Sequence, residues 1–198
     1  MDDGRTTPKP AALRALSHPV RLRMLGELRI TGPSTASRLA ARFGLNTGAT
    51  SYHLRQLAQH GFVVEDEARG NGRDRWWRAA TPMTYTSDDS PDPDARAALD
   101  AFGQAAVVVY TEILQRAVGE RPRLPDAWRR VHALSDWQLR LTPDQARGLR
   151  DEITGVLDRW QAADPGPDGA AAAGAMPVTF HLHTFPRPGS VGPTEDQP

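Results

Sequence analysis

Residues suited to contacting a polyanion gather in one stretch of the sequence, NTGATSYHLRQLAQHGFV, at residues 46–63. Asn46 is a favourable cap for a helix that follows it, and Gly61 is a favourable residue to end that helix. Between them, Thr50, Leu54 and Leu57 recur at i, i+4 and i+7, the spacing of one helical face. We therefore expect these three side chains to face a core.

The other positions of this helix form a slim leading end with little charge. They are Thr47, Gly48, Ala49, Ser51 and Tyr52, followed one turn later by Arg55. Hydroxyl groups can exchange hydrogen bonds with base edges or phosphates, and an arginine can pair with a phosphate or a guanine edge. This pattern favours a helix whose N-terminal turns enter the major groove of DNA. The alternative is a capped core helix with its polar side chains in solvent.

A hairpin is predicted directly after this helix. Residues 62–64 (FVV) and 76–77 (WW) are strand-like, and the intervening ARGNGRDR contains the turn signal Gly-Asn-Gly at residues 70–72. Arginines that flank the turn could hold a phosphate backbone: Arg69, Arg73 and Arg75. The alternative is an ordinary solvated loop. Successive strand residues point to opposite faces, so one of Trp76 and Trp77 is expected in the core.

Helical spacing also marks the residues before position 46. Two short helices are expected between residues 10 and 30, meeting at Ser17-His18-Pro19, with Ser17 as a cap and Pro19 in a first turn. Ser34 is expected to cap a third helix that ends at Gly44. The connection to the next helix is then only GLN, residues 44–46. Short helices followed by a hairpin indicate a winged helix-turn-helix over residues 10–82, within a mostly α protein that has a small β component.

Charge and composition narrow the function classes. The 198 residues carry no net charge, but residues 1–80 hold thirteen basic and seven acidic residues, and residues 81–198 hold eleven and seventeen. The N-terminal part therefore suits a polyanion better than the C-terminal part does. The absence of cysteine excludes disulfides, thiolate metal sites and thiol redox switches. We find neither a signal peptide nor an apolar run of membrane-spanning length, so a cytoplasmic protein with no membrane partner is expected.

Three stretches together resemble the winged-helix repressors of the ArsR type: LRALSHPVRLRML, then STASRLAARFGLNTGATSYHLRQLAQHGFV, then GRDRWWRAA. The resemblance spans residues 11–80 and implies a homodimer that binds double-stranded DNA, blocks transcription and lets go when an effector binds. It places the DNA-facing positions at Thr47, Gly48, Ala49, Ser51, Tyr52 and Arg55. It also implies that His53 and Leu54 support this helix from within, and that Arg21 braces the domain through a carboxylate or a helix end.

The sequence departs from the metal-sensing members of that family. Those proteins carry a cysteine pair before the turn, or Asp and His ligands on the terminal helix, whereas this chain has no cysteine. The long helix expected after the winged domain has no histidine near Asp100. No cofactor is therefore expected.

A long helix is predicted beyond a linker at residues 83–91. Asp92 is a favourable cap and Pro93 a favourable first residue, so the helix is expected over residues 92–120. Apolar residues follow it at steps of three and four, a seam that a helix of a second copy could fill: Leu99, Phe102, Ala106, Val109 and Ile113.

An α+β region is predicted over residues 121–186, for dimerisation or for binding an effector. Alternating apolar residues favour strands at 136–141 and 177–185, and Thr142-Pro-Asp-Gln145 is a capping box that opens a helix between them. His181 and His183 share one strand face and are the candidate metal ligands, with His132 or a carboxylate to complete the set. No third ligand is evident in the sequence, so histidines on a solvated strand face are preferred to a metal site, and a small organic effector held between the long helices and this small sheet is preferred to a metal as the ligand. Residues 1–9 and 187–198 are expected to be disordered.

Enzymatic activity is not expected, because the sequence has no nucleophile elbow, phosphate loop, zinc-protease motif or dinucleotide fingerprint. The preferred hypothesis is a homodimeric repressor that binds duplex DNA. The alternatives are a winged-helix adaptor for RNA or protein, and a regulator with a catalytic C-terminal domain.

Overall fold

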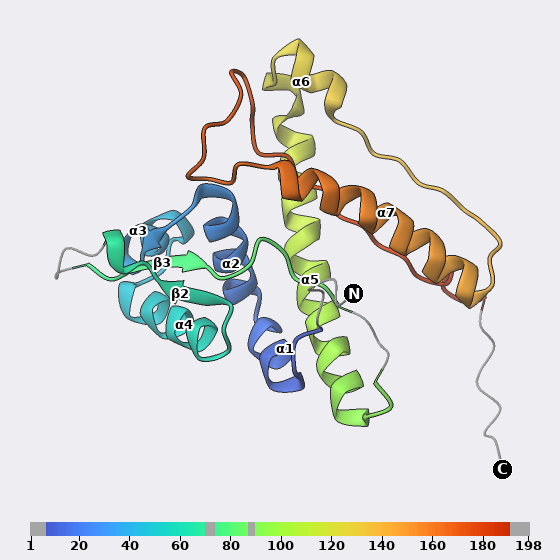
Figure 1. The fold of residues 1–198 in the computed structure, drawn as a ribbon, viewed down its shortest axis with the longest axis horizontal. Helices are drawn as coiled ribbons and strands as arrows, with labels where there is room; N and C mark the ends of the chain where they lie inside the picture. The colour runs from blue at the N-terminus through green and yellow to red at the C-terminus, as the bar shows by residue number, and fades with distance from the viewer. Residues whose placement is uncertain (1–6, 70–73, 87–89, 191–198) are drawn as a thin grey trace. The chain divides into compact units, whose positions relative to one another are not determined.

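The computed structural model describes residues 7–69, 74–86 and 90–190 (Figure 1). Arg73 and the glycine turn at 70–72 lie outside these ranges, as do parts of the two ends predicted to be disordered. The chain divides into two units, residues 1–131 with 166–171, and residues 132–165 with 172–198. The first unit holds most of the helices and a small antiparallel sheet, which confirms the predicted fold class.

The first unit opens with two helices, α1 (Pro10–Leu16) and α2 (Pro19–Thr31), which meet where predicted. Pro19 is the first residue of α2, also as predicted. The cap differs, because it is His18 whose Nδ1 accepts the Val20 N–H at 3.2 Å. The Ser17 hydroxyl instead donates to the Leu13 carbonyl at 2.9 Å and so bonds back onto α1.

The third helix, α3 (Ala36–Phe43), begins one residue later than predicted. Thr35, not Ser34, is its cap, and the Thr35 hydroxyl accepts the Arg38 N–H at 3.3 Å. The reason is that Ser34 and Thr35 form a short strand, β1 (Ser34–Thr35), whose backbone is already extended. Gly44 ends α3 as predicted, with φ +64°, a left-handed conformation that glycine adopts without steric cost.

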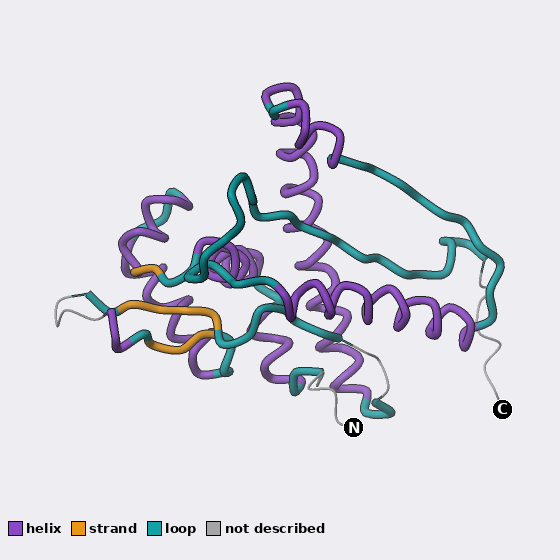
Figure 2. Tube along the Cα trace, turned by 45° about the horizontal axis from the view of Figure 1, so that its top comes forward, coloured by secondary structure: helices purple, strands orange, loops and turns teal. Residues whose placement is uncertain are grey.

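The predicted hairpin is present as β2 (Val63–Glu65) and β3 (Trp76–Ala79), with a 3₁₀ turn, η1 (Glu67–Arg69), between them. The sheet also includes β1, in the order β1-β3-β2 with every pair antiparallel (Figure 2). Val64 lies opposite Arg78, and Ser34 lies opposite Trp77. Trp77 is 6% exposed and belongs to the core, whereas Trp76 is only partly covered.

The core of the first unit is apolar and continuous. It is formed by α1, α2, α3, the following helix α4 (Thr47–Gln59), strands β2 and β3, and the long helix α5 (Pro93–Glu120). Its fully buried large side chains are Leu13, Leu16, Met24, Leu25, Leu28, Leu39, Leu54, Leu57 and Val63. Arg29 crosses the edge of this core and donates to the Thr81 carbonyl at 2.9 Å and to the Thr84 hydroxyl at 3.0 Å. Burial lowers the pKa of Arg29 to about 10.

Helix α5 begins as predicted, with the Asp92 carboxylate accepting the Asp94 N–H and Pro93 in the first position. Its predicted seam is occupied from within the chain. Phe102, Ala106 and Val109 are buried in the core, and Leu99 and Ile113 pack against it. The contacts come from α1 and α2, so this stripe is not open to a helix of a second copy (Figure 1). The apolar period was correctly recognised, but its partner belongs to the same chain.

The segment Pro93–Arg123, which is α5 together with a short turn, η2 (Arg121–Arg123), is long and apolar enough to cross a membrane by length and composition alone. Core helices pass the same test, and α5 contributes Ala98, Phe102 and Val109 to the core described above. A short helix, α6 (Asp126–Val131), follows it.

In the described part of the second unit the one helix is α7 (Pro143–Ala163), which opens with the predicted capping box. The Thr142 hydroxyl accepts the Gln145 N–H at 3.3 Å, and the Gln145 side chain accepts the Thr142 N–H at 2.9 Å. The strands predicted at 136–141 and 177–185 are not formed. Both segments are extended, but among the described residues neither is paired as a strand. The sheet of the structure lies entirely in the first unit.

Candidate nucleic-acid interface

The orientation of α4 is fixed by its buried face. Thr50, Leu54 and Leu57 are each 0% exposed, which confirms the face predicted to point into the core. The Thr50 hydroxyl donates to the Asn46 carbonyl at 3.1 Å, so this buried polar group is satisfied locally. The opposite face of α4 is thereby held toward solvent.

The leading end of α4 is capped and slim. Asn46 Oδ1 accepts the Ala49 N–H at 2.7 Å, as predicted. A Cβ added at Gly48 would lie 3.3 Å from this same oxygen, so glycine leaves the cap uncrowded. Thr47 and Gly48 are exposed, and Ala49 is partly exposed. Backbone N–H groups of the first turn therefore face outward with little bulk around them.

The larger polar side chains follow on the same outward side. Tyr52 is 52% exposed, Arg55 is exposed and Ser51 is partly exposed. Arg55 Nε donates to the Ser51 carbonyl at 3.2 Å, which aligns its guanidinium along the helix surface. All six positions predicted to face DNA thus lie on one exposed end and side of α4.

Helix α3 packs against α4, and the connection between them is only residues 44–46. The Leu45 N–H donates to the Ala40 carbonyl at 2.9 Å and tightens this turn. The sequence of residues 16–66 matches the model of a family described as a helix-turn-helix domain. This part of the chain is a helix-turn-helix domain. No curated protein matches the chain.

The arginines around the hairpin of this helix-turn-helix domain are less available for binding phosphate than the sequence pattern indicated. Arg75 Nε lies 3.1 Å from Glu65 Oε2, and Arg69 pairs with Asp66 at 3.5 Å and with Asp168. Each of these arginines therefore has a carboxylate that offsets part of its charge. Arg73, the third predicted arginine, lies outside the described residues.

A further arginine of the domain was not predicted as a site residue. Arg38 is exposed on α3, the first helix of the helix-turn-helix pair, and its guanidinium lies 4.6 Å from the centre of the Trp76 ring. The aromatic ring holds the cation in place without neutralising it. In helix-turn-helix complexes the first helix crosses the DNA backbone, so this position suits a phosphate contact. An arginine among the outward positions of 36–43 was the available sequence signal.

Two histidines support α4 from the inner side. The ring centres of His18 and His53 lie 4.7 Å apart, and those of His53 and Tyr52 lie 5.6 Å apart. Arg21, nearby on α2, donates to the Ala15 and Arg14 carbonyls at the end of α1, which confirms its predicted bracing role. Burial, and then the Arg21 charge, lower the pKa of His18; burial, and then the neighbouring His18 and Arg21, lower that of His53.

This pair predicts a loss of stability in acid. The unfolded chain binds protons on both histidines below their ordinary pKa of 6.5, whereas the folded chain resists protonation. The free energy of unfolding should therefore have its full value above about pH 6.5 and decrease as the pH falls toward the lowered pKa values of the folded state. Urea unfolding of the wild type and of His53→Gln at about pH 7.5 and about pH 5.5 measures this. An equally steep pH dependence in His53→Gln would contradict this assignment.

The cap of α4 gives a second prediction. Asn46→Ala should lower the free energy of unfolding by about 1 kcal/mol, because the Ala49 N–H loses its acceptor. Asn46→Ser is the matched control, since serine caps a helix about as well. Urea unfolding compares the three proteins. A loss in Asn46→Ser as large as in Asn46→Ala would show that the cap is not the source of the effect.

In the second unit, the candidate ligands His181 and His183 have ring centres 6.0 Å apart. Among the described residues, no group of three or more His, Asp or Glu side chains is placed to hold a metal ion.

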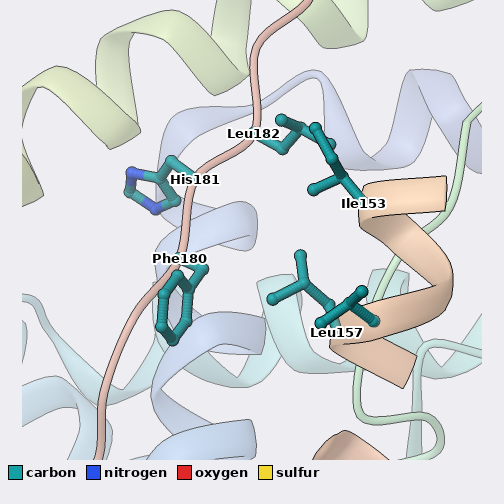
Figure 3. A pocket seen from close by; sticks show the side chains of 6 residues that line it. Ile153, Leu157, Phe180, His181 and Leu182 are labelled. Carbon is teal, nitrogen blue, oxygen red and sulfur yellow. The ribbon is translucent and has the colours of Figure 1, made fainter. Parts of the chain in front are cut away.

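The segment that contains these histidines does line a cavity in the second unit. Ile153, Val156 and Leu157 of α7 face Phe180, His181 and Leu182 across a space of about 330 Å³ (Figure 3). Figure 3 shows the His181 ring turned away from α7.

Proposed function

We propose that this chain is a transcription regulator of the ArsR type that binds a specific sequence of double-stranded DNA. The observation that carries the proposal is the orientation of α4. Its buried face locks the helix onto the core, while its slim, capped end and the Tyr52 and Arg55 side chains face solvent. A helix held in this way can enter the major groove and meet base edges with its N-terminal turns.

Phosphate contacts then come from two elements beside α4, the helix α3 and the hairpin, whose Arg38 and Arg69 both lie near the Trp76 ring. Arg38 on α3 supplies a cation held by Trp76. Arg69 and Arg75 supply the hairpin side, after exchanging their carboxylate partners for phosphate oxygens. Such contacts fix the orientation of the protein on the duplex, and they make the affinity fall as salt rises.

The regulator acts as a homodimer through the outward face of α5. At 100° per residue, Val107, Leu114 and Val118 lie on the side of α5 opposite the buried residues, and they are 59%, 44% and 45% exposed. They follow one another at steps of seven and four, a stripe that a second copy of α5 can cover. Two copies would present two α4 helices to half-sites about one helical turn, roughly 34 Å, apart.

Repression ends when an effector favours a dimer whose α4 helices no longer match this spacing. An effector must bind the two states with unequal affinity to do so. The cavity between α7 and residues 180–182 supports a small, mainly apolar effector, because its volume reaches the lower range of ligand sites and its lining is aliphatic and aromatic.

A binding competition tests the proposed function. The purified chain is mixed with labelled duplex DNA at low ionic strength, and unlabelled duplex DNA or duplex RNA is added in increasing amounts. Duplex DNA should compete far better than RNA, because the deep and narrow major groove of RNA does not admit α4. Equal competition by RNA would favour the adaptor function instead. Absence of any duplex binding would overturn the proposal.

A further inference from the structure

Residues 136–141 form an extended segment whose side chains are exposed to solvent. Trp137, Leu139 and Leu141 are 79%, 59% and 42% exposed, and Asp136, Gln138 and Arg140 are exposed as well. Both faces of this strand-like segment therefore meet solvent. Among the described residues it has no strand partner, although its alternation of apolar and polar residues is typical of a strand.

The other described residues of the second unit do not complete a core around this segment. Helix α7 has no buried residue, and Ile153, Val156 and Trp160 are 39%, 44% and 76% exposed. Exposed apolar area of this extent marks an interaction site in a soluble protein. An extended segment with an open backbone edge is in addition a template for a further strand.

We propose that residues 136–141 pair antiparallel with the same residues of a second copy of this chain, centred on Gln138. The charges select this partner and this register. With Gln138 opposite Gln138, Asp136 of each copy lies opposite Arg140 of the other. Two complementary ion pairs therefore form across the strands, and among the described residues neither side chain forms an ion pair within its own chain.

The same register also places apolar residues opposite apolar residues. Trp137 of each copy lies opposite Leu139 of the other, an aromatic–aliphatic pair of the kind that stabilises sheets. Both members of every pair then share a face, because residues with even numbers meet even numbers and odd meet odd. If the pairing is centred on Trp137 or Leu139 instead, apolar and polar residues stay on their own faces, but Asp136 no longer lies opposite Arg140. The pairing thus makes one continuous apolar surface from the two copies.

This pairing deepens the proposed homodimer and rests on it for the second copy, but it uses a surface separate from α5. The chain has no cysteine, so single cysteines can report the register directly. Residues directly opposite in an antiparallel pair have Cα atoms about 4.5–5.5 Å apart, a distance that suits a disulfide. Arg140 in the two copies would be separated by about 14 Å at about 3.4 Å per residue, too far for a disulfide.

The full-length Gln138→Cys variant should form a disulfide-linked dimer under mild oxidation. Arg140→Cys alone should form almost none, whereas a mixture of Asp136→Cys and Arg140→Cys should give the mixed dimer. Arg140→Asp placed in the Gln138→Cys protein should slow linking several-fold, and adding Asp136→Arg should restore it. Equal linking of Gln138→Cys and Arg140→Cys, or linking of neither, would overturn the register and the pairing.

Binding of duplex DNA is measured on the same Gln138→Cys protein before oxidation. If it binds DNA but does not link, the strand pairing is wrong while the proposed function stands. If it links in the expected pattern but binds no duplex, the pairing stands and the proposed function fails.

Discussion

Val109→Asp should unfold the first unit, whereas Val107→Asp should leave it folded. The two valines lie two positions apart on α5, but Val109 is 2% exposed and Val107 is 59% exposed. A carboxylate at position 109 would be buried among apolar side chains with no partner, which costs about 4 kcal/mol or more. The same carboxylate at position 107 stays in water and costs under about 0.5 kcal/mol of folding free energy.

Urea unfolding and analytical sedimentation together distinguish the two roles of α5. Val107→Asp should unfold at nearly the wild-type urea concentration but sediment as a monomer or a weakened dimer, because the charge lies in the stripe proposed for the second copy. Val109→Asp should show no cooperative transition. A folded Val109→Asp protein would contradict the packing of α5 onto α1 and α2, and an unchanged Val107→Asp dimer would remove the outward stripe from the interface.

The second large effect concerns DNA. Tyr52→Ala and Arg55→Ala should each weaken binding to the selected operator by about 1–3 kcal/mol, roughly 5- to 150-fold, with little change in stability. Both side chains are exposed, so their loss opens no cavity. Binding to random duplexes should weaken much less, because base contacts carry sequence preference and phosphate contacts do not.

Arg116→Ala is the matched control for these variants. It removes the same charge from an exposed position on another helix, α5. Fluorescence anisotropy with operator and random duplexes at one salt concentration measures all three variants. A loss in Arg55→Ala that is equal on both duplexes would place Arg55 on a phosphate rather than on a base. A loss as large in Arg116→Ala would indicate a general charge effect.

The sequence predicted the local features of the helix-turn-helix domain well, because local signals determine them. Asn46 as a cap, Gly44 as a stop and the buried set Thr50, Leu54 and Leu57 each follow from the residue type and its immediate spacing. The same was true of Asp92 at the start of α5. In these cases the interacting residues are separated by no more than one or two helical turns along the chain.

Features that depend on distant residues were missed or mistaken. Strand β1 has two residues and exists only because Trp76 and Trp77 pair with it, so Thr35 replaced Ser34 as the cap. The seam at Phe102, Ala106 and Val109 has a period that shows an apolar face but does not show which helix covers it. The strands expected at 136–141 and 177–185 have the right alternation but lack a partner among the described residues.

The candidate site was anticipated on α4 but overestimated at the hairpin. Six positions of α4 face solvent as expected, since the buried face fixes the opposite one. Arg69 and Arg75 were counted as available cations, yet Asp66, three residues before Arg69, and Glu65, across the hairpin from Arg75, offset part of their charge. Arg38 was overlooked because its support, the Trp76 ring, comes from a distant strand.

The most direct measurement is selection of bound duplexes from a random pool by the full-length protein, followed by sequencing. A slender, capped α4 presented by a rigid core should enrich an inverted repeat whose half-sites are centred about one helical turn, roughly 34 Å, apart. Tyr52→Ala with Arg55→Ala should abolish that enrichment. A pool that remains random after repeated rounds at low ionic strength would contradict the claim that α4 reads duplex DNA.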